Sequence, residues 1–144
     1  MTSLKALTTT LRQAGMRITP QRIAICKLLV GTDTHPTAAR IYEEIRAQYP
    51  SLSLTTVYNT LDTLADLGAI HVLGHAGDDT VHYDANTKPH VNLACVSCHK
   101  IADIASPKVA RIHQEISATS GYKLLGARVM YYGLCPSCQN SKSN

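Results

Sequence analysis

Two C-x-x-C pairs are the residues of this chain best suited to metal chemistry: Cys95 with Cys98, and Cys135 with Cys138. Each pair can present two sulfur atoms to one ion, and four thiolates suit a tetrahedral zinc ion. Because four sulfurs leave no open coordination position, the spacing predicts a structural zinc site. The alternative is a group of buried thiols or a disulfide. The remaining cysteine, Cys26, lies on an apolar helix stripe and is predicted to pack in the core.

Nitrogen and oxygen donors elsewhere in the chain suggest a second metal site: His35, His82, Asp84, His90, Asn92 and Asp103. His90 and Asn92 alternate along a predicted strand and so point to one side, as do His82 and Asp84. Imidazole and carboxylate ligands together suit Fe(II), Mn(II) or Zn(II). Asparagine can ligate only through its carbonyl oxygen. An isolated histidine is more often an ordinary core or surface residue than a ligand, so none of these histidines alone identifies a metal site.

Composition limits the class of protein. The chain has 144 residues, enough for one domain or two small ones, and 44% apolar residues are enough for a core. No apolar run approaches the ~20 residues of a membrane span, and the N-terminus lacks the apolar segment of a signal peptide. We therefore expect no membrane contact and a cytoplasmic location, where cysteines favour metal or redox chemistry over disulfides. A formal net charge of +4 permits contact with phosphates without demanding it.

The first half of the chain reads as helical and then changes pattern. Apolar periodicity and capping residues predict helices over residues 3–14, from Thr19, from about Thr37, and over 53–67. Strand-like runs at 69–73 and 80–84 then flank a turn-rich stretch. Helices followed by a β-hairpin predict a winged helix-turn-helix domain over residues 1–86.

The second half is predicted to be a smaller α+β domain. Residues 87–89 read as a linker, and residues 90–144 as a domain with two strands around the first cysteine pair, a helix near 107–119 and a strand over 127–134. The fold class expected for the whole chain is therefore mainly α with an α+β part.

The fourth predicted helix carries polar residues at its solvent-facing N-terminal end: Thr55, Thr56, Tyr58 and Asn59. A recognition helix uses such positions in the major groove, where threonine can contact phosphate or a thymine methyl and asparagine can pair with adenine. An ordinary polar helix face is the alternative. Arg17 and Arg22 are expected to contribute to overall DNA affinity more than to sequence preference.

Five motifs, in order along the chain, resemble the ferric uptake regulator family of bacterial repressors: RITPQR, HPTA, TVYNTL, HVNLACVSC and CPSC. The resemblance runs from about Leu4 to Cys138. It implies a winged-helix DNA-binding domain, a dimerisation domain, a structural zinc held by the four cysteines, and a regulatory metal between the domains.

Within this family the chain looks most like the peroxide-sensing branch. The positions that match the regulatory ligands are His35, Asp84, His90, Asn92 and Asp103. Two aspartates there are typical of the peroxide-sensing branch, but the family pattern has a histidine where this chain has Asn92. Three outcomes are open: the Asn92 amide oxygen ligates, water replaces it, or His82 substitutes for it.

The resemblance implies a metal-dependent transcriptional repressor. Fe(II) or Mn(II) would lock the two halves so that a homodimer fits a palindromic operator in double-stranded DNA. With iron bound, hydrogen peroxide would oxidise His35 or His90. The first alternative is a regulator of the same family that responds to iron, manganese or zinc, and the second is a zinc-ribbon protein-interaction module. The sequence holds no Ser/His/Asp order, phosphate loop or HExxH motif, so we do not expect an enzyme.

Overall fold

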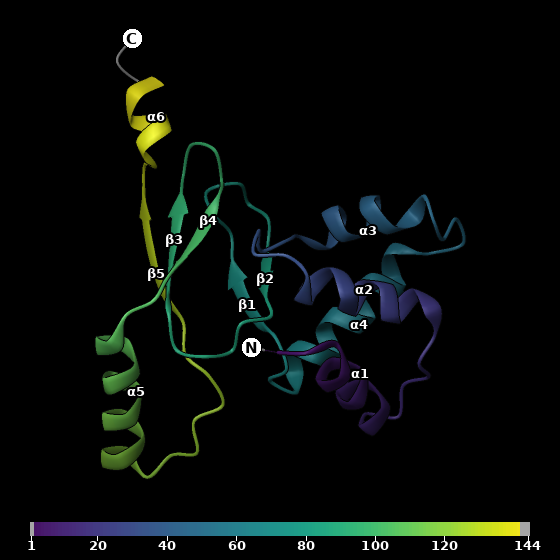
Figure 1. Cartoon of the computed structure of the whole chain (residues 1–144), viewed down its shortest axis with the longest axis horizontal. Helices are drawn as coiled ribbons and strands as arrows, with labels where there is room; N and C mark the ends of the chain where they lie inside the picture. Colours follow the sequence, from purple (N-terminus) through teal and green to yellow (C-terminus); the bar gives the residue numbers. More distant parts are fainter. Residues whose placement is uncertain (1, 142–144) are drawn as a thin grey trace.

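The computed structural model describes residues 2–141, as two halves side by side with a hairpin between them (Figure 1). Residue 1 and residues 142–144, which the predicted domains include, lie outside the described residues. The elements in chain order are α1 (Leu4–Gln13), α2 (Pro20–Val30), α3 (Ala38–Arg46), α4 (Leu54–Asp66), β1 (His71–Gly74), β2 (His82–Asp84), β3 (Val91–Cys95), β4 (Ile101–Ile104), α5 (Pro107–Ser120), β5 (Val129–Gly133) and α6 (Pro136–Ser141).

Side-chain caps define where the first four helices begin. The hydroxyl oxygens of Ser3, Thr19, Thr37 and Ser53 each accept a hydrogen bond from the backbone N–H three residues later, at 3.1, 3.2, 3.1 and 3.0 Å. Each cap satisfies one of the backbone donors that a helix leaves open at its start. The predicted helix starts at Thr19 and Ser53 are therefore confirmed.

The core of the N-terminal half lies between α1, α2, α3 and α4. Its fully buried side chains include Leu7, Leu11, Ile25, Ile41, Val57, Leu61 and Leu64. Cys26 belongs to the same core with none of its surface exposed, and burial raises the pKa of its thiol to about 11. The prediction that Cys26 is a packing residue is therefore confirmed.

The hairpin of β1 and β2 follows the helices directly, in the position of a wing. The two strands are antiparallel, with His71 opposite Asp84 and Val72 opposite Tyr83. Strand β2 is buried along its whole length because it lies between the helices and the C-terminal half (Figure 1). Four helices and this hairpin form the predicted winged-helix arrangement.

The C-terminal half is a three-stranded sheet in the order β4-β3-β5. Strand β3 pairs antiparallel with β4, which places Asn92 opposite Asp103, and parallel with β5, which places Cys95 opposite Gly133. Helix α5 carries the chain between β4 and β5, and α6 follows β5 (Figure 1). The short helix α6 was not predicted from the sequence.

A second small core joins the wing to the sheet. Leu73 and Ala76 from the hairpin are buried against Ala94 and Ile101 from β3 and β4. The two halves therefore share packed surface at the end of the wing, close to the first cysteine pair. Among the described residues, no helix is long and apolar enough to cross a membrane.

Candidate metal centres

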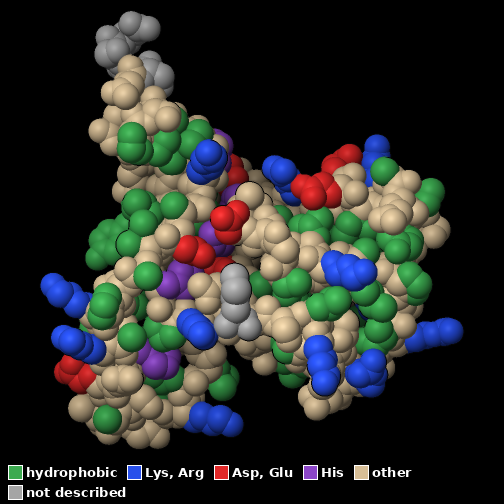
Figure 2. Space-filling view, in the orientation of Figure 1, with side chains coloured by type: hydrophobic (Ala, Val, Ile, Leu, Met, Phe, Trp, Pro, Cys, Tyr) green, Lys and Arg blue, Asp and Glu red, His purple; other side chains and the backbone are tan. Residues whose placement is uncertain are grey.

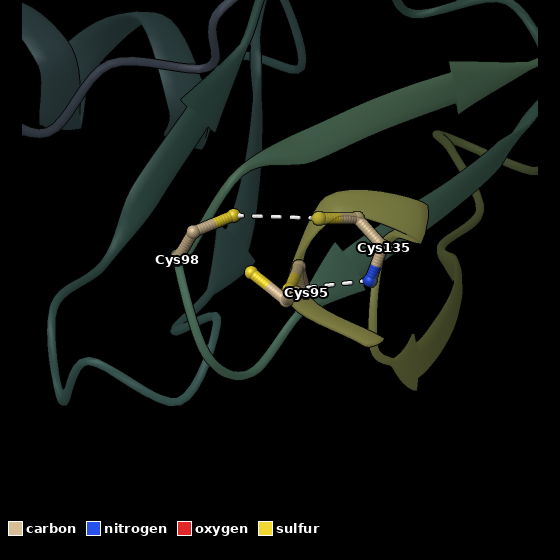
Figure 3. A group of neighbouring side chains, drawn as sticks. Cys95, Cys98 and Cys135 are labelled. Atoms are coloured by element: carbon tan, nitrogen blue, oxygen red, sulfur yellow. Dashed lines mark hydrogen bonds between the residues drawn. The ribbon is translucent and has the colours of Figure 1, made fainter. Parts of the chain in front are cut away.

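The four paired cysteines meet at one end of the sheet. Their sulfur atoms all lie within 4.8 Å of one another. Sγ of Cys98 is 3.9 Å from Sγ of Cys135, and Figure 3 shows these two residues together with Cys95. Four sulfurs about 2.3 Å from one zinc ion would lie about 3.8 Å apart, so the cluster has the dimensions of a tetrahedral zinc site. This chain therefore has the four-cysteine cluster for a structural zinc that the sequence predicts.

Strand pairing explains how cysteines distant in sequence come together. Cys95 ends β3, and the turn after it is closed by the N–H of His99, which donates to the Cys95 carbonyl at 2.8 Å. Because β5 runs parallel to β3, the chain reaches Cys135 beside Cys95, and the N–H of Cys135 lies 3.4 Å from the Cys95 sulfur. The backbone N–H groups of Cys135 and Cys98 lower the pKa of Cys95 to about 5, which favours the thiolate that zinc requires.

A second cluster lies where the two halves meet. His35 Nε2 is 2.7 Å from Asp103 Oδ1 and 3.6 Å from Asp84 Oδ2. His90 Nε2 is 2.9 Å from Asp84 Oδ2, 3.4 Å from Asp103 Oδ1 and 3.2 Å from Asn92 Oδ1. Acidic and histidine side chains gather along the junction of the two halves in Figure 2. The structure thus brings together all five residues that the family resemblance indicates.

The five members of this cluster come from four separate segments of the chain. His35 precedes α3, Asp84 ends the wing strand β2, and Asp103 lies on β4. His90 lies just before β3 and Asn92 within it, so both reach the site from the strand that pairs with β4. Asp103 is the most open member, with 31% of its side chain exposed, whereas Asp84 has 5% exposed.

Backbone groups orient two of these side chains. The N–H of Asn86 donates to Asp84 Oδ1 at 2.8 Å, which leaves Oδ2 for the cluster. Nδ1 of His90 donates to the Lys88 carbonyl at 2.6 Å, which points Nε2 toward Asp84. A hydrogen bond of this kind at one ring nitrogen fixes the other as a metal ligand. Sequence reasoning did not identify these orienting contacts.

The electrostatics of the cluster couple histidines to carboxylates. Burial lowers the pKa of His35, but hydrogen bonds and charges of Asp84 and Asp103 outweigh it and raise the pKa overall. The pKa of His90 is also raised, since the Lys88 carbonyl and both aspartates outweigh its burial. Burial raises the pKa of Asp84, but bonds to His35 and to the Asn86 N–H lower it overall. The cluster therefore attracts positive charge.

The donor set fits a small divalent cation. In an octahedral complex with metal–ligand distances of about 2.1 Å, neighbouring donors lie about 3 Å apart, similar to the 2.7–3.6 Å separations here. Two carboxylates balance the charge of a dication, and two neutral imidazoles supply nitrogen. Asn92 has 2% of its surface exposed and directs its amide oxygen toward His90, so its side chain is part of this cluster.

His82, one of the three possibilities raised by the unusual asparagine, has other partners. Its Nδ1 donates to the backbone carbonyl of His35 at 2.7 Å, and its Nε2 lies 2.8 Å from Asp78 Oδ2. Both ring nitrogens are therefore directed away from the donor atoms of the cluster. The geometry places Asn92, and not His82, beside His90.

The expected DNA-contacting residues divide by exposure. Thr55, Tyr58 and Asn59 are exposed near the start of α4, whereas Thr56 is half-buried and shares a 2.9 Å hydrogen bond with the Ser53 hydroxyl. Arg17 is exposed before α2, and the guanidinium of the half-buried Arg22 donates to the Arg17 carbonyl. Arg22 thus orders the backbone at Arg17.

The fold and the two clusters define a class of protein: a winged-helix regulator with a structural zinc site and a second metal site at the junction of its halves. The sequence profile of the ferric uptake regulator family matches residues 13–132. The chain belongs to the ferric uptake regulator family.

Individual proteins of this family are similar to the chain in sequence and in structure. The chain is 38% identical over 130 residues to the peroxide-responsive repressor PerR of Staphylococcus aureus, an alignment that covers 90% of this chain and 87% of that protein. The PerR structure from Streptococcus pyogenes, solved for peroxide sensing and gene regulation, is 37% identical with a TM-score of 0.54 and coverage of 96% and 95%. The Helicobacter pylori ferric uptake regulator shares the fold, with a TM-score of 0.76, 24% identity and coverage of 98% and 97%. Membership of a family of transcriptional regulators agrees with the expectation that the protein is not an enzyme.

Proposed function

We propose that this protein is a metal-dependent transcriptional repressor that binds a palindromic operator as a homodimer and is released by hydrogen peroxide. The observation that carries the proposal is the cluster of His35, Asp84, His90, Asn92 and Asp103, which joins the winged-helix half to the sheet. A cation bound there would link residues of both halves and so fix their relative orientation. We infer that these five residues are the regulatory ligands and that the cysteines hold zinc.

The donor set also favours particular metals. Imidazole from His35 and His90 is outnumbered by oxygen from Asp84, Asp103 and Asn92, and oxygen-rich sites suit Mn(II) and Fe(II) better than Zn(II). Bound Fe(II) would supply the one-electron reduction of hydrogen peroxide, which Mn(II) does not readily perform. The imidazole rings of His35 and His90 lie next to that position and are the groups we expect to take up oxygen.

The DNA-binding role rests on the winged helix. Tyr58 and Asn59 are exposed near the N-terminal end of α4, where a recognition helix contacts bases, and Arg17 is exposed where it can contact phosphate. We propose residues 1–86 as the DNA-binding domain, 87–89 as a linker and 90–144 as the dimerisation domain. Exposed apolar side chains on the C-terminal half agree with dimerisation: Leu93, Ile104, Ile112, Ile116, Tyr131 and Tyr132. Because a bacterial repressor acts on DNA, we propose a cytoplasmic location.

Operator binding tests the proposal directly. The protein loaded with zinc and then with Fe(II) or Mn(II) should shift a DNA fragment carrying its operator, selected from random sequence, whereas protein loaded with zinc alone should not. Hydrogen peroxide should release the iron form and spare the manganese form. Equal responses of both forms to peroxide would favour the second candidate, a regulator of metal uptake, which the same oxygen-rich site also suits.

A further inference from the structure

His82 makes two contacts with other parts of the chain and contributes no donor atom to either metal cluster. It lies on β2 with 7% of its surface exposed. Nδ1 donates to the backbone carbonyl of His35 at 2.7 Å, across 47 residues of sequence, and Nε2 is 2.8 Å from Asp78 Oδ2. A side chain held at both ring nitrogens has a fixed orientation, so it can fix what it contacts.

The side chain of His35 depends on a contact to its backbone for its orientation, because its ring has no orienting hydrogen bond of its own within the described part of the chain. The ring nitrogen that faces away from the cluster, Nδ1, is buried and has no hydrogen-bond partner among the described residues. A metal-ligating histidine is ordinarily oriented by a hydrogen bond at that second nitrogen. In addition, the backbone of His35 has a φ of +53°, a left-handed conformation that residues other than glycine rarely adopt. The direction of this ligand therefore depends on contacts to its backbone.

Strand β2 supplies those contacts. The His82 side chain binds the carbonyl of His35, and the next backbone N–H, of Tyr83, donates to the carbonyl of Pro36 at 3.0 Å. The segment before α3 is thus held along the edge of the wing strand. This arrangement keeps the His35 peptide in its left-handed conformation with Nε2 toward Asp103.

The other partner of His82 is itself anchored. Oδ1 of Asp78 accepts hydrogen bonds from the N–H groups of Ala76 and Thr80 at 3.0 and 3.3 Å, which leaves Oδ2 for His82. The Ala76 carbonyl accepts from Nδ1 of His99 at 3.0 Å, next to the first cysteine pair. Gly77 packs so closely on Val96 that a Cβ there would lie 3.2 Å from it. The wing tip that carries Asp78 is therefore docked on the turn that holds Cys95 and Cys98.

We propose that His82 is a positioning residue for the metal ligand His35. Asp78, fixed in the wing tip, orients the His82 ring, and His82 in turn holds the His35 carbonyl and so directs Nε2 of His35 into the regulatory cluster. This inference rests on the proposed regulatory role of that cluster. It assigns a role to a residue outside the five proposed ligands.

Two substitutions separate the two contacts of His82. The amide nitrogen of asparagine lies where Nδ1 of histidine does, so His82→Asn keeps a donor for the His35 carbonyl and loses the contact with Asp78. The amide nitrogen of glutamine lies where Nε2 does, so His82→Gln keeps the contact with Asp78 and loses the His35 carbonyl. Mn(II) affinity, measured from the electron paramagnetic resonance signal of unbound Mn(II), is the readout, with zinc content and thermal unfolding as measures of folding.

We expect His82→Asn to lose no more than about threefold in Mn(II) affinity, because the His35 carbonyl keeps a donor although Asp78 no longer orients it. We expect His82→Gln to bind about 10- to 100-fold more weakly, the usual effect of losing an orienting partner of a ligand. Both variants should retain one zinc per chain. In the metal-free proteins, the Tyr83 amide should exchange hydrogen faster in His82→Gln than in His82→Asn.

Two results would overturn the proposal: wild-type Mn(II) affinity in His82→Gln, or equal weakening in both variants. Equal weakening would indicate that His82 is itself a ligand or a general packing residue. His35→Ala distinguishes failure of the proposed function from failure of this inference. If wild type and His35→Ala bind Mn(II) equally, the regulatory site is wrongly assigned; if only His35→Ala is impaired, His82 alone is wrongly assigned.

Discussion

Nε2 of His35 lies 2.7 Å from Oδ1 of Asp103, although one residue precedes helix α3 and the other lies on strand β4. This contact joins the helical half to the sheet through two residues that are far apart in the sequence. A dication bound by these two atoms would replace their direct contact with metal–ligand bonds to residues of both halves. Under the proposed function, oxidation of either histidine of the cluster would weaken those bonds and so alter the geometry of DNA binding.

The first prediction concerns the four-cysteine cluster. Cys95→Ser should lose the bound zinc, because three thiolates and a hydroxyl bind zinc much more weakly, and the C-terminal half should unfold at lower temperature. Elemental analysis and circular dichroism measure the two effects. Cys26→Ala is the matched control, since Cys26 is buried in the helical core and should keep full zinc occupancy. Full zinc in Cys95→Ser would contradict the assignment.

The second prediction concerns DNA recognition. Asn59→Ala should reduce the preference for the operator over random DNA by about 1 to 3 kcal/mol, the value of one good base contact. Arg17→Ala should weaken binding to both DNAs and reduce the slope of log K against log salt by about 0.9, the effect of one phosphate contact. Fluorescence anisotropy at several salt concentrations measures both. An unchanged preference in Asn59→Ala would show that the recognition face lies elsewhere.

The third prediction concerns peroxide. After treatment of the iron form with hydrogen peroxide, mass spectrometry of peptides should find one added oxygen on His35 or His90, and operator binding should be lost. The manganese form should show neither change, because Mn(II) does not readily reduce peroxide by one electron. Oxidation confined to the cysteines would instead indicate a thiol sensor.

The fourth prediction concerns pH in zinc-loaded protein without a regulatory metal. Because the pKa values of His35 and His90 are raised in the folded protein, protonation of these rings stabilises the fold. This stabilisation is complete below their ordinary pKa of about 6.5 and is lost as pH rises through the raised values. The lowered pKa of Asp84 acts in the other direction, since its contribution is present above its ordinary value of 3.8 and is lost as pH falls. The unfolding free energy should therefore decrease as pH rises above about 6.5.

Mn(II) should reverse this trend. Its ligands must be deprotonated, so binding strengthens as pH rises and adds to the unfolding free energy. Urea denaturation at several pH values, with and without Mn(II), compares the two cases. In His35→Ala the difference made by Mn(II) should be small at every pH. Stability of the metal-free wild type that increases with pH over this range would contradict the assigned histidine–carboxylate pairs.

The extent to which sequence predicts this structure depends on how local each feature is. The helix starts at Thr19 and Ser53 follow from hydroxyl caps that act over three residues. The zinc cluster follows from the C-x-x-C spacing, which occurs first at Cys95 and again at Cys135. The parallel pairing of β3 with β5 joins segments distant in sequence, so no periodicity reveals it. Helix α6 was missed because PSCQNS carries almost no apolar pattern.

The candidate site shows the same limit. Residue types indicated which side chains could ligate, but not which atom each would present. The contact of His82 with the His35 carbonyl depends on a positive φ at His35 and on a wing tip docked through Gly77. Neither leaves a sequence pattern beyond a glycine in a turn. Sequence alone therefore could not decide whether His82 ligates a metal or positions another ligand.

The last prediction concerns Asn92, which stands where the family pattern has histidine. Its buried amide oxygen lies 3.2 Å from Nε2 of His90, and the strand register places it opposite Asp103. Asn92→His should tighten binding of the regulatory metal by about 1 to 3 kcal/mol, on the scale of allosteric couplings, because a neutral imidazole is a stronger donor than an amide oxygen. It should also raise the affinity for Zn(II) relative to Mn(II), since nitrogen ligands suit zinc.

Asn92→Ala distinguishes a ligating amide from a water-filled position. If the amide oxygen ligates, its removal should weaken Mn(II) binding, whereas a water ligand would leave the affinity nearly unchanged. Titration of Mn(II) and Zn(II) into wild type and both variants, with operator binding as readout, gives the comparison. If wild type, Asn92→His and Asn92→Ala respond identically to both metals, Asn92 lies outside the coordination sphere, and the metal is held by the histidines and aspartates alone.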